Sequence, residues 1–233
     1  MEAMQEFFSD SVFFGVVISI LAYELGVFLK KKLKWAICNP LLIAIVAVIV
    51  FLVAFQIPYE SYNEGAKYLS YLLTPATVCL AIPLYEQVEL LKKYPVAIVA
   101  GLVTGVVTSV GCVLVLAALF KLDHATYVTL LPKSITTAIG MGISEELGGY
   151  VTITVAVIII TGVLGNIMAE TVCRIFKIEE PVAKGIAIGA SAHALGTARA
   201  MELGEVEGAM SSLSIAVAGL LTVMAAPIFA MFL

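Results

Sequence analysis

The sequence predicts an all-α, polytopic membrane protein with two inverted structural repeats that contain broken or re-entrant helices. Composition is the first reason: 61% of the 233 residues are hydrophobic and 13% are charged, with a mean hydropathy of +1.08. A soluble domain is closer to half apolar and a quarter charged. The second reason is a series of apolar runs near the length of about 20 residues that crosses a bilayer. The third is that Pro, Gly and polar residues interrupt some of these runs.

Uninterrupted apolar runs predict the membrane spans. These runs are Val12–Leu29, Leu41–Phe55, Val96–Phe120, Val151–Thr171 and Ala209–Leu233. Lysines at positions 30, 31, 32 and 34 follow the first span, which places that end in the cytoplasm under the positive-inside rule. After the second span we expect a polar connection over Glu60–Lys67.

Three further apolar segments are interrupted by helix breakers or polar residues. They are Tyr68–Leu91, which contains Thr74-Pro75 and Pro83; Tyr127–Leu147, which contains Pro132-Lys133-Ser134; and Gly185–Leu203, which holds small and polar residues around His193. In lipid, irregular backbone is tolerated only where it is buried in protein or lines a watery cavity. We expect the first and third segments to enter the membrane and return, and Tyr127–Leu147 to cross it.

The two halves of the chain resemble each other in pattern. Ala100–Thr104 (AGLVT) returns as Ala218–Thr222 (AGLLT), and each half carries a broken segment before its last span. Paired interrupted segments are typical of secondary transporters with internal repeats. We therefore predict one integral membrane domain over residues 1–233, with repeats at about 11–120 and 125–233.

Charge favours re-entry of the two broken segments over crossing. With re-entry, the Lys30–Lys34 and Arg174–Lys184 basic loops both face the cytoplasm, whereas Lys92, Lys93 and both termini lie outside. If both segments crossed instead, the two basic loops would lie on opposite sides. The sequence alone leaves crossing and re-entry as alternatives.

Other classes of protein are disfavoured by what the sequence lacks. The acidic N-terminus, MEAMQEFFSD, is unlike a signal peptide, so we expect the first span to be retained in a multi-pass inner (plasma) membrane protein. Four scattered cysteines show no metal-binding spacing, and we expect neither metal nor cofactor. HExxH and GxSxG motifs are absent, which argues against an enzyme. The sequence also lacks a basic patch with interleaved aromatic residues, so we do not expect it to bind nucleic acid.

The polar residues of the broken segments suggest a site for a small carboxylate. Lys133 and Arg199 supply positive charge, and Arg can hold a carboxylate in two parallel hydrogen bonds. Backbone groups freed by Pro and Gly, at the N-termini of half-helices, favour an anion. His193 titrates near neutral pH and is a candidate for proton coupling, with Glu202 as a second. The predicted substrate-binding residues are Thr74, Tyr85, Lys133, Ser134, Thr136, Thr137, His193, Thr197 and Arg199.

Each of these residues also has a purely structural interpretation. Lys133 and Arg199 can extend their charges to the membrane interface without any ligand. Arg199 and Glu202, three residues apart, can form an ion pair on one helical face. His193 can be a hydrogen-bonded core residue, and the hydroxyls can bond neighbouring helices.

Three motifs in this order resemble the LrgB/CidB family of bacterial membrane proteins. They are Pro132–Thr137 (PKSITT), Ile159–Gly165 (IITGVLG) and Ser191–Gly204 (SAHALGTARAMELG). The resemblance covers essentially the whole chain, including Thr74-Pro75 and Pro83-Leu84-Tyr85, and extends to the carboxy-terminal part of the plastidial glycolate/glycerate translocator. One departure is Ala138, where many relatives carry proline.

The resemblance implies two competing functions. One is a holin/antiholin-like regulator of murein hydrolase activity and autolysis, acting with a small LrgA/CidA-type membrane protein. The other is carriage of small monocarboxylates such as pyruvate, glycolate, glycerate or lactate, with or without proton coupling. Paired, interrupted, cation-bearing segments favour the carrier, because a holin needs only apolar helices that oligomerise. We also expect the chain to form a homo-oligomer in the lipid bilayer.

Overall fold

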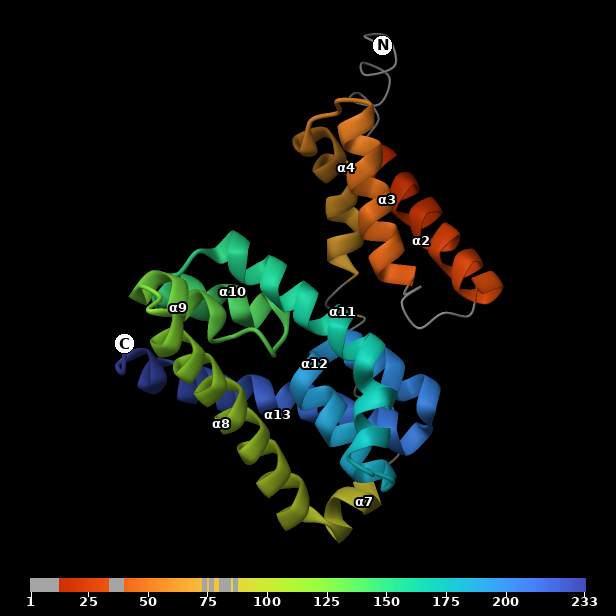
Figure 1. Ribbon diagram of the computed structural model, residues 1–233. Coiled ribbons are helices and arrows are strands. Elements are labelled where there is room, and N and C mark those ends of the chain that lie inside the picture. The colour runs from red at the N-terminus through yellow and green to blue at the C-terminus, as the bar shows by residue number, and fades with distance from the viewer. Residues whose placement is uncertain (1–12, 34–39, 73–74, 76–77, 80–84, 86–87) are drawn as a thin grey trace. The chain divides into compact units, whose positions relative to one another are not determined.

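The computed structural model describes residues 13–33, 40–72, 75, 78–79, 85 and 88–233. These residues form helices joined by short turns, without strands in the described part, as the sequence predicts (Figure 1). The chain divides into two compact units, Met1–Cys79 and Leu80–Leu233.

The first unit contains α2 (Phe14–Leu33), α3 (Pro40–Ala54) and α4 (Tyr59–Tyr71). The α2 helix packs against both other helices, and Ser19 of α2 shares a 2.8 Å hydrogen bond with the hydroxyl of Tyr62 in α4. The residues expected to form a polar connection, Glu60–Lys67, lie within the helix α4. Gly65 of this helix is buried where α4 meets α2.

Three helices of the second unit are long and apolar enough to cross a membrane. They are α8 (Pro95–Phe120), α11 (Val151–Ile175) and α13 (Glu205–Ala230), which confirm three of the predicted spans. At about 1.5 Å per residue each is close to 38 Å long, more than the roughly 30 Å of hydrocarbon in a bilayer. A short helix, α7 (Val88–Lys93), precedes α8.

The segment between α8 and α11 folds as a re-entrant hairpin of two short helices, α9 (His124–Leu130) and α10 (Thr137–Glu146). Asp123 caps α9 by accepting hydrogen bonds from the backbone N–H and hydroxyl of Thr126, and these bonds hold the pKa of Asp123 below its usual value of 3.8. The chain turns at residues 131–135, where Pro132 cannot donate a backbone hydrogen bond.

Hydrogen bonds join both arms of this segment to the start of α11. The Thr154 hydroxyl, at the start of α11, donates to the carbonyl oxygen of Thr129 in α9 and to the hydroxyl of Ser144 in α10. The Tyr150 N–H donates to the Thr129 hydroxyl at 2.7 Å. Both arms of the hairpin therefore meet at one end of α11, and Tyr127–Leu147 does not make the predicted crossing.

The predicted break in Gly185–Leu203 is confirmed within α12 (Pro181–Leu203), where His193 leaves helical geometry at φ 43° and ψ −138°. The helix doubles back there, because Ile188 before the break clusters with Ala200 and Leu203 after it. The first arm lies along α13: a Cβ at Gly185 would be 2.5 Å from the Glu207 carbonyl oxygen. This is the second re-entrant hairpin.

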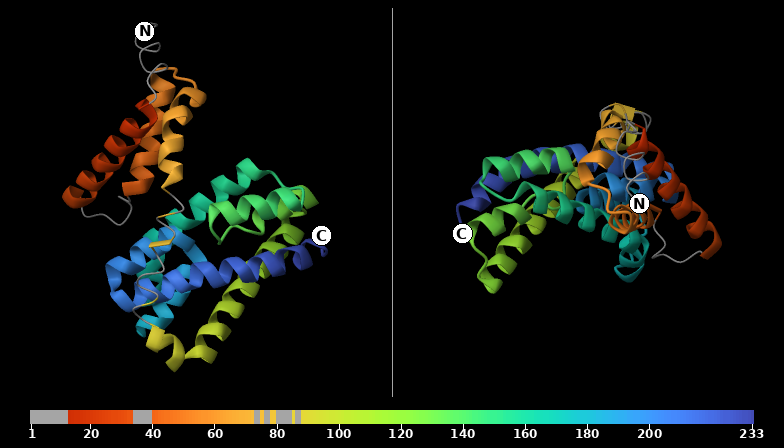
Figure 2. Two further views of the ribbon diagram at one scale, coloured as in Figure 1. Left: turned by 180° about the vertical axis from the view of Figure 1, so that it is seen from behind. Right: turned by 90° about the horizontal axis from the view of Figure 1, so that it is seen from above.

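The two hairpins enter the second unit from opposite ends. Tyr127 of the first hairpin donates to the Phe229 carbonyl near the end of α13, and His124 lies 3.3 Å from the carbonyl oxygen of Leu233. The second hairpin starts at the other end, where the Gly101 and Gly105 turns of α8 face Ile186 and Ala190. Figure 2 shows α13 running from the α12 hairpin to the C-terminus.

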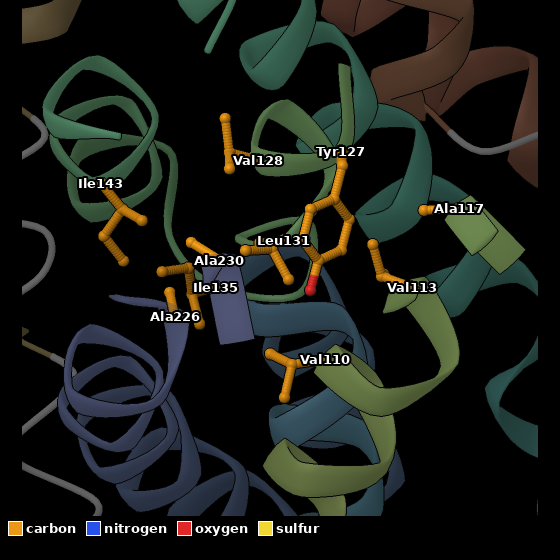
Figure 3. Close-up of a cluster of buried hydrophobic side chains, with 10 residues drawn as sticks. All are labelled: Val110, Val113, Ala117, Tyr127, Val128, Leu131, Ile135, Ile143, Ala226 and Ala230. Atoms are coloured by element: carbon orange, nitrogen blue, oxygen red, sulfur yellow. The ribbon is translucent and has the colours of Figure 1, made fainter. Parts of the chain in front are cut away.

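Besides the cluster of Ile188 with Ala200, two larger apolar clusters pack the unit, one around each hairpin. The first joins α8, the α9–α10 hairpin and α13 around the fully buried Tyr127 (Figure 3). The second joins α8, the first arm of α12 and the start of α13 around Leu102 and Met210. Fully burying side chains of this kind is worth about 1.5–3 kcal/mol each in water, and dispersion contacts remain in lipid.

This arrangement changes the predicted membrane topology. Because Tyr127–Leu147 returns, α8 and α11 are consecutive spans, and Lys92-Lys93 and the Arg174–Lys184 loop lie at the same end of the unit, called here the Pro95 end. The expectation that Lys92 and Lys93 face the side opposite that loop is therefore wrong. The inverted relation between residues 11–120 and 125–233 stays a prediction.

Candidate functional site

A cavity of about 1200 Å³ lies in the second unit, between α8, the turn of the first hairpin, α11 and the first arm of α12. Most of its wall is apolar or made of small residues, whereas its polar groups come from both hairpins and both spans. The polar side chains that line it are Tyr94, Thr104, Thr108, Ser109, Cys112, Lys133, Ser134, Thr161, Glu180 and Ser191.

Lys133 brings an ionisable amino group into this cavity from the turn of the first hairpin. Its Nζ donates to Ser134 Oγ at 2.9 Å and to Ser109 Oγ at 3.4 Å, and the Ser109 hydroxyl donates to Ser134 Oγ at 3.0 Å. Among the described residues no ion pair joins Lys133 to a carboxylate. The structure thus groups two predicted site residues, Lys133 and Ser134, with the hydroxyl of a span.

The second hairpin contributes its first arm to the cavity and turns just beyond it. Ser191 lines the cavity and donates to the Ala187 carbonyl oxygen at 2.7 Å. Two residues later the chain reverses at His193. The turns of the two hairpins therefore approach the same space from opposite ends of the unit, as Lys133–Ser134 and Ser191 both line it.

His193 itself packs into α11 and not into the cavity. Its side chain is only 4% exposed, and its Nε2 lies 3.0 Å from the Ile158 carbonyl oxygen. Gly162 makes room for it, since a Cβ there would be 2.6 Å from the imidazole ring. Asn166 of α11 donates to the Leu195 carbonyl oxygen at 2.7 Å. The Ile159–Gly165 motif thus forms the part of α11 against which the turn of the second hairpin packs.

Thr197 also has a structural place in the hairpin. Its hydroxyl donates to the His193 carbonyl oxygen at 3.0 Å and shares a 2.6 Å hydrogen bond with Ser211 of α13. It is almost fully buried, and the described cavity lining does not include it. Its hydroxyl closes the break at His193 and links the returning arm to α13.

Arg199 lies on the returning arm of α12, where it forms ion pairs with Glu170 of α11 and with Glu202. None of these three residues is among the described residues that line the cavity. The structure therefore does not bring Arg199 and Lys133 together, and Glu202 serves as a partner of Arg199. Glu170, to which the sequence suggests no role, completes the group.

The remaining predicted residues lie apart from the cavity or outside the description. Thr136 is the N-cap residue of α10, and both it and Thr137 are half-buried. Tyr85 is 80% exposed. Thr74 lies outside the described residues.

Sequence reasoning missed the polar face of α8 and Thr161 of α11. Thr104, Thr108 and Cys112 are spaced four residues apart, so they share one helical face, and Ser109 adjoins it. Polar residues at this spacing in an otherwise apolar span indicate a helical face that lines a cavity.

Comparison with known proteins places this architecture in a family. The model of the LrgB-like family matches residues 19–232. The antiholin-like protein LrgB of Bacillus mycoides (strain KBAB4) is 41% identical over 222 residues, which cover 95% of this chain and 96% of that protein. The proteins of that name from Bacillus cereus (strain B4264) and Bacillus anthracis (strain CDC 684 / NRRL 3495) match to the same extent. No solved structure matches the chain. This membrane protein therefore belongs to the LrgB-like family.

Proposed function

We propose that the protein is an antiholin-like membrane protein whose molecular activity is the carriage of a small monocarboxylate, such as pyruvate, glycolate, glycerate or lactate. The antiholin-like role is supported by the names of relatives that align over nearly their full length. Carriage is supported by the cavity that the turn of the first hairpin and the first arm of the second hairpin line. In this proposal an effect on cell lysis follows indirectly, from altered metabolite or proton balance across the membrane.

The arrangement of Lys133, Ser109 and Ser134 is the observation that carries the transport proposal. The side-chain nitrogen of Lys133 is held by two neutral hydroxyls in a mostly apolar cavity, and an ionisable residue of this kind within the membrane is retained in proteins for a function. A carboxylate bound at Nζ supplies the missing counter-charge. The hydroxyls of Ser109, Ser134 and Thr161 are then within the same cavity to bond a hydroxyl or keto oxygen of the substrate.

The opposed hairpins suit a carrier because each can act as a gate toward one side of the membrane. Secondary transporters bind substrate near the bilayer midplane between discontinuous helices and open alternately to the two sides. Here Lys133 contacts Ser109, near the middle of α8, and His193 contacts Ile158 within α11.

A second candidate is a regulator or pore subunit that has no substrate site and controls murein hydrolase activity and autolysis. The specific observation in its favour is the antiholin-like name of the relatives. In this case the cavity is a surface for helix packing, and a small LrgA/CidA-type membrane protein is the expected partner of the chain.

Transport into liposomes separates the two candidates. A carrier takes up labelled pyruvate or glycolate with saturation, discriminates between them and excludes unrelated solutes, whereas a pore leaks all of them. Lys133→Met should abolish saturable uptake, because the substrate loses its counter-charge. The matched control is Lys121→Met, which removes a lysine at the C-terminus of α8 and should leave uptake intact. Non-saturable leakage that both variants share would support the pore.

The Pro95 end of the unit is proposed to be cytoplasmic. Lys92 and Lys93 lie there together with Arg174, Lys177 and Lys184, three residues that line a smaller pocket of about 290 Å³. Basic residues concentrate on the cytoplasmic side of membrane proteins. Cysteine labelling at Lys177→Cys in inverted and right-side-out vesicles tests this orientation in the inner membrane.

A further inference from the structure

We propose that Lys133 is the proton carrier of this transporter: its amine is neutral while the cavity is empty and becomes protonated as a carboxylate binds. The inference deepens the proposed carrier function and rests on it. It also moves proton coupling away from His193 and Glu202, the residues that sequence reasoning favours.

The surroundings of Lys133 favour a side chain that changes its charge during the cycle. Its described hydrogen-bond partners, Ser109 and Ser134, are neutral and can stabilise an ammonium group or donate to a free amine. A permanently charged group at membrane depth is costly unless it is paired. Lysine, unlike arginine, gives up its proton readily when buried. The empty cavity therefore favours the amine, and the bound carboxylate favours the ammonium ion.

The other titratable groups around the cavity do not replace the missing counter-ion. Cys112, from α8, is a titratable side chain that lines the same cavity as Lys133. The α11 and α12 walls contribute Thr161 and Ser191, which do not titrate. Tyr94 and Glu180 line the part of the cavity at the Pro95 end, and neither has an ion pair with Lys133 among the described residues.

His193 and Glu202 are poorly placed to take a proton from the substrate path. The His193 ring is buried against the Ile158 carbonyl oxygen, and Gly162 and Gly165 hold the hairpin turn tightly on α11. Glu202 is paired with Arg199 on the returning arm. In contrast, Lys133 lines the cavity itself.

Proton and charge balance in this cycle. A proton from water on one side binds Lys133 Nζ together with the carboxylate, so the loaded site carries no added net charge. When the hairpins open to the other side, the carboxylate leaves and the ammonium group releases its proton there. The empty carrier then returns with a neutral amine, and each turnover moves one acid molecule without net charge.

The direct test is the proton uptake that accompanies substrate binding. Pyruvate or glycolate is added to the purified protein in weakly buffered detergent solution at neutral pH, and a pH indicator records the protons taken up. The wild-type protein should take up about one proton for each carboxylate bound. Lys133→Arg, which keeps a permanent charge, should take up none for any substrate that it still binds. In liposomes an acidic exterior should drive accumulation by the wild type and not by this variant.

A histidine-free chain provides the second test, because the sequence has only His124 and His193. The double variant His124→Gln/His193→Gln should still take up one proton per carboxylate. Loss of proton uptake in this variant with binding intact would overturn the inference, as would full proton uptake in Lys133→Arg. If the wild type shows saturable substrate uptake but takes up no proton on binding, the proton-carrier inference is overturned and the carrier function stands. Absence of both binding and saturable uptake in the wild type rejects the carrier function itself.

Discussion

The side-chain amide of Asn166 donates a 2.7 Å hydrogen bond to the carbonyl oxygen of Leu195, and this bond fastens α11 to the turn of the second hairpin. Leu195 comes two residues after the break at His193, where the helical hydrogen-bond ladder is interrupted. A side chain of α11 therefore binds the backbone just after the break. Contacts of this kind with neighbouring helices help to hold irregular backbone in place at membrane depth.

Asn166→Ala should destabilise the second hairpin. The Leu195 carbonyl oxygen loses this side-chain donor, and an intramolecular hydrogen bond of this kind contributes about 0.5–1.5 kcal/mol. The measurement is the thermal unfolding midpoint of the purified protein in detergent. Asn63→Ala, at an exposed position of α4, is the control and should unfold close to the wild-type temperature. Equal midpoints for the two variants would contradict a role for Asn166 at the turn.

Gly162→Ala should displace the hairpin turn, because the added Cβ would lie 2.6 Å from the His193 ring. Overpacking of this kind costs about 1–3 kcal/mol. Gly111→Ala in α8 is the matched control, since a Cβ there meets nothing within 4 Å. The control should be neutral or slightly stabilising, as alanine is favoured over glycine in a helix by about 1 kcal/mol. Comparing the two midpoints separates steric displacement from helix propensity.

The Arg199–Glu170 ion pair should be detectable as coupling between the two residues. A double-mutant cycle compares the free energies of unfolding of the wild type, Arg199→Gln, Glu170→Gln and the double variant. The pair is partly exposed, so a coupling of about 1 kcal/mol or less is expected. If Arg199 binds substrate instead, Arg199→Gln should weaken carboxylate binding while Glu170→Gln leaves it unchanged. If both single variants have equal, small effects on carboxylate binding, the ion pair stabilises the structure and Arg199 does not bind substrate.

Asp123 should make stability depend on pH in the acid range. Hydrogen bonds from Thr126 lower the pKa of the folded-state carboxyl below its usual value of 3.8. The stabilisation is therefore present above pH 3.8 and is lost as pH falls through the lower pKa of the folded state. Unfolding midpoints of the wild type and Asp123→Ala, measured from neutral to acid pH, should differ at neutral pH and converge below that pKa. A constant difference would show that the carboxylate charge does not matter.

Local sequence features predict much of the second unit. Long apolar runs indicate α8, α11 and α13 as spans, and Pro132 and the small residues around His193 mark the two breaks. These features are predictable because each has a cause that depends only on local sequence. Bilayer thickness sets the length of a span, proline lacks the N–H of a helical hydrogen bond, and polar groups are costly in lipid. The same motifs indicate the LrgB-like family, which the family match confirms.

The segment Glu60–Lys67 shows what local reasoning leaves open. The sequence predicts a polar connection there, and the structure adds that the segment is helical and places Tyr62 and Gly65 against α2. Its Glu, Ala and Lys residues are good helix formers, so the low hydropathy of the segment does not oppose a helix. Which face of this helix meets α2 depends on tertiary packing, which composition does not reveal.

By itself, the amino-acid sequence determined that this is a helical membrane protein and that helices break near Pro132 and His193. The tertiary structure alone decided that Tyr127–Leu147 returns, because that depends on Thr154 bonding Thr129 and Ser144 from another helix. It also decided that Lys133 lies beside Ser109 while Arg199 pairs with Glu170. Helix breaks arise from interactions between neighbours in sequence. Which residues line a cavity, in contrast, depends on contacts between residues far apart in the chain.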